Sequence, residues 1–294
     1  MLAIALAISS ALGFGSAAIF ARLGLQDIRP IPGTLISGVA SFLPTLVLAL
    51  IFALSDLRSL PLIAYVFLLG HGALTYIGGR GQNLLAIDLI GAARSGPFVG
   101  SSALFSTLFA ATIAGERLHP VVALGTVAVV IGLIFSSGDL WHMGWRLDRN
   151  SLLGYALALG AAASYGASNI VAKELSLNYG SPLVIAAWST LFGTLLLTPF
   201  SGREAMAGLR TARGSWGFLA LTGLAAALAV VALYFGFLKS SVVVVAPISS
   251  TNPLITLLLA HLFLARLERV TRWLLAGTFL AVAGVALIIV GSTL

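Results

Sequence analysis

The sequence has no cysteine and very little charge. Among its 294 residues, the absence of cysteine excludes disulfides, thiolate catalysis and cysteine metal sites. Its four histidines are scattered without the spacing of metal ligands. Charged residues make up 9% and hydrophobic residues 59%, whereas soluble domains are about one quarter charged. This composition predicts a protein that folds mainly in lipid.

The P-loop motif for ATP and the motifs for common catalytic chemistry are missing. The two lysines follow Ala172 and Leu238, so no Gly-Lys pair exists for a P-loop. Gly-x-Ser-x-Gly and His-Glu-x-x-His are both absent. The net charge of +7 is spread over short loops without a basic run, which argues against nucleic-acid binding. We expect no enzyme, no cofactor and no bound metal, with a membrane enzyme acting on lipid as a minor alternative.

Long apolar segments, each bounded by charge, proline or glycine, dominate the chain. A helix needs about 20 apolar residues to cross a bilayer, and ten segments meet that need. The first five are residues 2–24, 33–54, 61–89, 91–115 and 119–136. The second five are residues 151–175, 182–201, 215–238, 241–264 and 271–290. The sequence therefore predicts an all-α membrane protein with ten transmembrane helices.

An internal repeat relates the two groups of five segments. Shifts of 151 or 152 residues match the pairs Glu116/Glu268, Arg117/Arg269, Gly125/Gly277, Thr126/Thr278, Gly132/Gly284, Phe14/Tyr165 and Arg22/Lys173. We therefore expect one repeat at 1–136, a linker at 137–150 and a second repeat at 151–294. Because five is odd, the second repeat enters the membrane from the opposite side. Inverted repeats are typical of alternating-access transporters.

Two segments, residues 86–118 and 233–270, each end in Glu-Arg before a glycine-rich last helix. This repeated pattern resembles that of the drug/metabolite transporter superfamily, and among its members the EamA-type repeat is the most similar. The resemblance implies a ten-helix transporter of amino acids or related small metabolites, usually an exporter. The chain departs from the family pattern where Ser101 stands in place of a mid-helix proline, and where Phe14 and Tyr165 stand in place of tryptophan.

Arg80 lies deep inside an apolar segment. At about 100° per residue, Tyr76 and Asn83 lie about 40° and 60° from it, so the three residues share one helix face. Burying a guanidinium in a membrane costs free energy, and its planar set of N–H donors matches the oxygens of a carboxylate or phosphate. This face therefore predicts a site for an anionic or zwitterionic substrate. Alternatively, Arg80 reaches the membrane interface or pairs with Asp88. His71 lies about 180° away and is expected to pack between helices.

A second polar group lies in the segment 151–175. We expect Ser164, Tyr165, Ser168 and Asn169 to line the cavity near the midplane, opposite the matching Phe14. The alternative is hydrogen bonding between helices. Tyr234 is a weaker candidate for ligand stacking.

Matched interruptions occur in segments 91–115 and 241–264. Ser249, Ser250 and Asn252 lie between Pro247 and Pro253, and Ser101 and Ser102 follow Pro97. Paired interruptions point to a transport site, so these serines and Asn252 are predicted to contact substrate and the three prolines to act as hinges. Purely structural kinks are the alternative. The two Glu-Arg pairs are expected to cap helices and form ion pairs.

All nine carboxylates lie in loops or near segment ends, which argues against proton-coupled exchange of hydrophobic cations. The sequence predicts a secondary transporter of small metabolites, such as amino acids or organic anions, with a midplane site between the repeats. A flippase for lipid or a lipid-linked headgroup is the alternative. Expected partners are a small-molecule substrate and membrane lipid. We expect a monomer or homodimer in the inner membrane of a prokaryotic cell.

The orientation of the chain stays open. The loops on the side of the termini carry four lysines and arginines, and the opposite loops carry eleven. The positive-inside rule then puts both termini outside. The family resemblance implies cytoplasmic termini.

Overall fold

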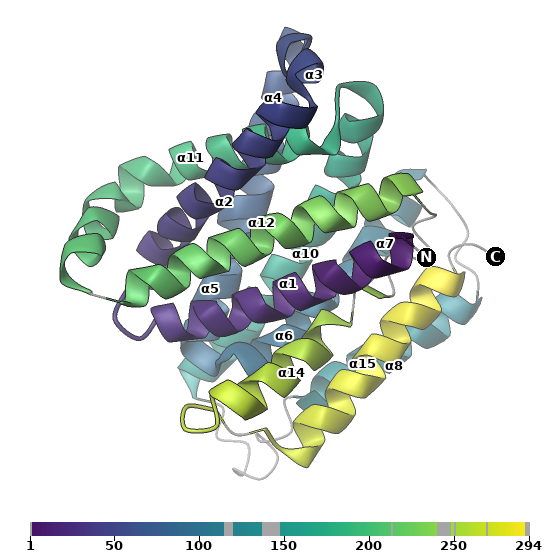
Figure 1. The fold of residues 1–294 in the computed structure, drawn as a ribbon. Helices are drawn as coiled ribbons and strands as arrows, with labels where there is room; N and C mark the ends of the chain where they lie inside the picture. Colours follow the sequence, from purple (N-terminus) through teal and green to yellow (C-terminus); the bar gives the residue numbers. More distant parts are fainter. Residues whose placement is uncertain are drawn as a thin grey trace.

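The computed structural model describes residues 2–114, 120–136, 148–212, 214–239, 248–249, 251–268 and 270–291, and its described elements are all helices (Figure 1). The first half contains α1 Leu2–Gly24, α2 Pro30–Phe52, α3 Leu54–Arg58, α4 Leu62–Gly72, η1 Ala73–Gly81, α5 Gln82–Ile90, α6 Ala92–Gly100, α7 Ser102–Ala114 and α8 Pro120–Ser136. The second half contains α10 Arg149–Asn178, α11 Pro182–Thr211, α12 Ser215–Lys239, α14 Asn252–Phe263 and α15 Arg272–Gly291. Glu116, Arg117, Pro247, Ser250 and Arg269 lie outside the described residues, as does most of the linker.

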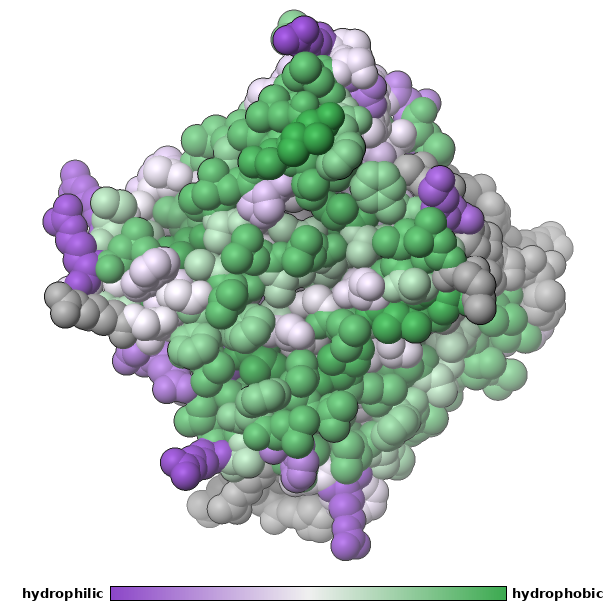
Figure 2. Space-filling model, viewed as in Figure 1, coloured by the Kyte–Doolittle hydropathy of each residue, from purple (hydrophilic) through white to green (hydrophobic). Residues whose placement is uncertain are grey.

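The predicted membrane fold is confirmed. α1, α2, α11, most of α12 and the continuous run α4–η1–α5 are long and apolar enough to cross a bilayer, while α8, α14 and most of α15 are shorter apolar helices. Large hydrophobic side chains such as Leu43, Phe67 and Leu228 are exposed. Figure 2 shows hydrophobic groups over most of one face and hydrophilic groups at its outer tips. This surface suits a surrounding of lipid.

α8 and α15, the last helices of the two repeats, lie side by side (Figure 1). A β-carbon added to Gly125 would lie 2.7 Å from the carbonyl oxygen of Gly284, and one added to Gly132 would lie 2.7 Å from that of Gly277. The repeat equates Gly125 with Gly277 and Gly132 with Gly284, so one contact is the symmetry partner of the other. Small residues let the two backbones meet, as in other membrane helix pairs.

α11 is longer than the predicted segment 182–201. The predicted segment ends at Ser201, yet the helix passes through Pro199 and continues to Thr211. The additional turns have their own packing, because Ala205 belongs to the same buried cluster as Ile28 and Leu219. Proline inside a helix removes one backbone donor and crowds the carbonyl group of the preceding turn, and this packing supports the helix beyond Pro199.

Candidate functional site

The middle of the third span is a π-helix, which the sequence analysis did not predict. η1 runs over Ala73–Gly81 and contains Tyr76 and Arg80. π-helical turns are rare and occur frequently at functional sites. A β-carbon on Gly79 would overlap the ring of Tyr165, and one on Gly78 would lie 2.6 Å from the hydroxyl of Ser164. The glycines of η1 therefore allow α10 to approach its backbone directly.

Arg80 is buried between helices of both repeats, with 9% of its surface exposed. Its Nη1 donates to Ser41 Oγ at 2.8 Å and to the Ser37 carbonyl oxygen at 3.3 Å, both on α2. Its Cζ lies 4.9 Å from the centre of the Tyr76 ring, within the range of a cation–π contact. These contacts fix the direction of the guanidinium without neutralising its charge.

Tyr165 of α10 interacts with both Arg80 and Asn83. Tyr76 donates its hydroxyl to Thr190 Oγ1 of α11 at 2.9 Å, and Tyr234 of α12 lies near Tyr76. The structure thus brings three predicted residues, Tyr76, Asn83 and Tyr165, around Arg80, and a fourth, Tyr234, lies beside Tyr76.

Arg80 makes no ion pair with a described carboxylate. Asp88, the expected alternative partner, lies beside Arg22 instead. The other described acids interact elsewhere: Asp27 with Ser215, Asp56 with the Ser181 amide, Asp148 with the Ser151 amide, Glu174 with Asn178, Glu204 with Arg29 and Glu268 with Arg22. A buried charge without a counter-ion is costly in a membrane protein, so Arg80 is a candidate for a functional site.

Ser168, one of the predicted polar residues on α10, contacts Thr75 and His71 instead of Arg80. Ser168 is buried, and its hydroxyl lies 2.6 Å from Thr75 Oγ1 and 2.8 Å from His71 Nε2. His71 Nδ1 lies 2.6 Å from Ser189 Oγ on α11. His71 therefore links three spans by hydrogen bonds, as expected for a helix-packing histidine. Asn169 is exposed, whereas Phe14 on α1 is partly buried.

The two helices that carry the matched interruptions, α6 and α14, contact each other at Gly100 and Pro253. A β-carbon on Gly100 would lie 2.6 Å from Pro253 Cγ. The Ser101 hydroxyl donates locally to the Phe98 carbonyl oxygen at 2.6 Å, whereas the Ser249 hydroxyl lies 3.1 Å from Ser10 Oγ on α1.

Three further predicted residues lie in or next to the crossing between α6 and α14. Asn252 donates to the Ser249 carbonyl oxygen at 3.2 Å. Pro97 and Pro253 line one small hollow. Ser102, at the start of α7, does not face α14, because its carbonyl oxygen lies against Gly166 of α10. None of the contacts found among the described residues links this crossing to Arg80.

Ser37, Ser41 and Thr190 are the residues near Arg80 that the sequence analysis missed. Each lies in a row of buried hydroxyls along an otherwise apolar span: Ser37, Ser41 and Thr45 on α2, and Thr190 and Thr194 on α11. Spacings of four residues put such hydroxyls on one helix face. That spacing is the signal that could have identified them.

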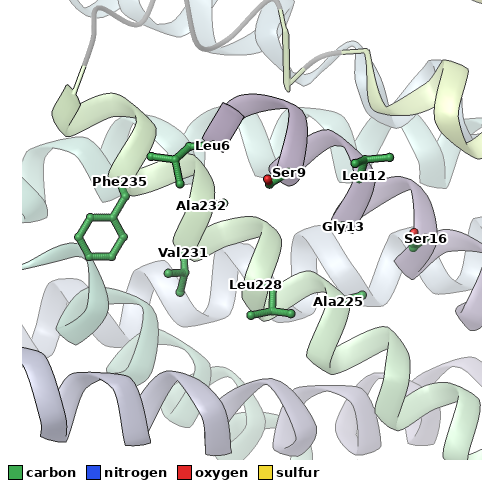
Figure 3. Close-up of a pocket in the computed structure, with 10 residues that line it drawn as sticks. All are labelled: Leu6, Ser9, Leu12, Gly13, Ser16, Ala225, Leu228, Val231, Ala232 and Phe235. Atoms are coloured by element: carbon green, nitrogen blue, oxygen red, sulfur yellow. The ribbon is translucent and has the colours of Figure 1, made fainter. Parts of the chain in front are cut away.

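A groove of about 560 Å³ lies between α1 and α12 (Figure 3), and Leu12 and Leu228 in its walls are exposed at the protein surface. It is mostly apolar, with Leu12, Leu228 and Phe235 among its walls. Ser9 and Ser16 supply its hydroxyls, and Ser9 bonds the Ala5 carbonyl oxygen of its own helix at 2.9 Å.

Comparison with known proteins agrees with this architecture. The sequence model of the EamA-like transporter family matches residues 1–138 and again residues 152–290. The chain belongs to the EamA-like transporter family. This EamA-like chain also matches a solved crystal structure with a TM-score of 0.66 and 18% identity, over 97% of this chain and 95% of that one. That likeness shows the fold alone. The comparison with curated proteins finds no match.

Proposed function

We propose that this membrane transporter carries small organic anions or zwitterions, such as amino acids, by alternating access. The observation that supports this most directly is Arg80, a buried cation held by Ser41 and Tyr76 without a described acidic partner. A carboxylate would supply the missing charge and could accept two parallel hydrogen bonds from the guanidinium.

The position of Arg80 also suits alternating access. Its neighbours come from α2 and η1 in the first repeat and from α10 in the second. In transporters built of inverted repeats, substrates bind near the midplane at the repeat interface. A substrate at Arg80 would contact both repeats and would respond to their relative movement.

A flippase is the second candidate, because the groove between α1 and α12 gives the lateral opening that a flippase needs. A polar headgroup would also need polar walls along its path. Ser9 and Ser16 are the only hydroxyl-bearing residues that line the described groove. The carboxylate proposal is therefore preferred.

The test is a binding and flux screen with purified protein over amino acids, organic acids, phosphorylated metabolites and cationic drugs. We expect carboxylates to raise the melting temperature and to cross proteoliposomes. Arg80→Ala should abolish both effects, and Arg80→Lys should keep part of them because it retains the charge but loses the planar set of N–H donors. Carboxylate flux that is unchanged in Arg80→Ala, or a response to cations alone, would refute the proposal.

A further inference from the structure

Outside the Arg80 site, the two repeats are also joined by an ion pair at the end of the bundle opposite the termini. Arg22, in the last turn of α1, lies with its Nε 3.2 Å from Glu268 Oε1. Glu268 follows α14 in the second repeat. The side chains are 22% and 7% exposed, so this pair is largely shielded from solvent.

Glu268 also caps the first helix of the fourth span. Its two carboxylate oxygens accept the backbone N–H groups of Ala92 at 2.7 Å and Ala93 at 2.8 Å. These are the first amides of α6, where a negative charge is favoured by the unpaired donors and the helix dipole. A β-carbon on Gly91 would lie 2.8 Å from Glu268 Cδ, and Gly91 has φ of +87°. Glycine is therefore the residue that permits this approach.

Arg22 binds the other side of the same turn. Its Nη1 lies 3.4 Å from the carbonyl oxygens of Ile87 and Asp88, at the end of α5. The turn between α5 and α6 is thus held by a cation from its own repeat and an anion from the other repeat. We call Arg22, Glu268 and the amides of Ala92 and Ala93 the clasp.

The clasp is connected to the candidate site through continuous helices. α5 follows η1 without a break and contains Asn83 beside the Arg80 site. α6 runs from the clasp to Gly100, where it contacts Pro253 of α14. Separating the end of α14 from α1 and α6 would break the ion pair and both capping bonds together. Such an all-or-none contact suits a two-state element.

We infer that the clasp is a gate that closes the Arg80 site toward the side of the membrane opposite the termini. This inference rests on the proposed function, because it assumes a site between the repeats that must open alternately to each side. The role goes beyond capping, since capping alone would not require the charge to come from the other repeat.

The absence of cysteine makes the gate directly testable, because an introduced thiol is the only one in the chain. We would place the reporter Asn83→Cys on α5 and measure its labelling by a membrane-impermeant maleimide in oriented vesicles, added to one side at a time. Glu268→Gln keeps the size of the side chain and removes the charge. We expect labelling from the clasp side to rise about tenfold, and labelling from the side of the termini to fall.

Arg22→Met is the second variant, because it removes the ion pair and leaves both capping acceptors in place. It should shift labelling in the same direction even if Glu268→Gln fails to fold. Glu204→Gln is the matched control: its pair with Arg29 also joins the repeats at this end, at 3.7 Å, but the side chains are 56% and 82% exposed. Exposed pairs contribute little, so labelling in this variant should match that of Asn83→Cys alone.

Labelling that is unchanged in a folded Glu268→Gln or Arg22→Met protein would overturn the gate. A rise from both sides together would overturn it too, since that indicates local unfolding. The assay needs no substrate, so its outcome is independent of whether Arg80 binds a carboxylate. Loss of carboxylate binding in Arg80→Ala with no labelling change in the clasp variants would leave the proposed function standing and reject the gate alone.

Discussion

Gly100 lies directly against the ring of Pro253, with room for no side chain between them. The two residues come from α6 and α14, the helices that the sequence shows to be interrupted in each repeat. The interruptions are therefore one structural feature, the point at which the repeats cross. A helix that breaks here can bend against its counterpart, and crossing helices must keep small residues at the contact.

Gly100→Leu should destabilise this crossing. A larger side chain would push α6 away from α14 and cost about 1–3 kcal/mol or more, which should lower the apparent melting temperature in detergent. Gly217→Leu is the control, because a β-carbon at Gly217 of α12 meets nothing within 4 Å. Equal melting temperatures for the two variants would show that the contact between Gly100 and Pro253 carries no stability.

The large-scale architecture could be predicted because its signals repeat. Ten apolar segments predicted ten helices, and the glycine pairs at a fixed offset predicted the internal repeat. The same glycines form the contact between α8 and α15. The surroundings of Arg80 were only partly predictable. Helical periodicity placed Tyr76 and Asn83 near Arg80, because residues three and four apart in an α-helix share a face. The π-helix at this point keeps these residues near Arg80.

Two features of the site were not predictable, for physical reasons. The π-helix at Ala73–Gly81 depends on how closely α10 packs against Gly78 and Gly79, which is a tertiary effect. Ser41 and Thr190 approach Arg80 and Tyr76 because of how α2 and α11 pack. The offset of the repeat does not help, because it matches Arg80 with an apolar residue, Ala232. The candidate site is asymmetric although the fold is symmetric.

Tyr76→Phe should separate the two roles of Tyr76. The change removes the hydrogen bond to Thr190 but keeps the ring over Arg80. We expect a stability loss of about 1 kcal/mol and carboxylate binding close to that of the parent protein, measured by thermal shift with and without ligand. Tyr76→Leu also removes the cation–π contact and should weaken binding further. If both variants bind equally well, the aromatic ring does not orient Arg80.

His71→Phe should destabilise the contact between α4, α10 and α11. His71 is buried, and its loss would leave Ser189 without its partner while Ser168 keeps Thr75. An unsatisfied buried polar group costs about 1–3 kcal/mol, so the melting temperature should fall. The double variant His71→Phe/Ser189→Ala should recover part of the loss, because it removes the orphaned hydroxyl. No recovery would mean that the cost arises from the volume of the ring instead.

Both ends of the chain should lie on the same side of the membrane, because ten crossings is an even number. Fusions of a reporter that is active on only one side of the membrane, placed at residue 1 and after Leu294, should therefore agree. A fusion after Gln26, beyond α1, should report the opposite side, and one after Ser59, beyond α2, should again agree with the N-terminus. Disagreement between the two ends would contradict the ten-helix count. The same reporters decide between the two orientations. The eleven positive charges on the opposite loops predict that the termini lie outside, and the clasp would then lie at the cytoplasmic end. If the termini are cytoplasmic, the clasp lies at the outer end.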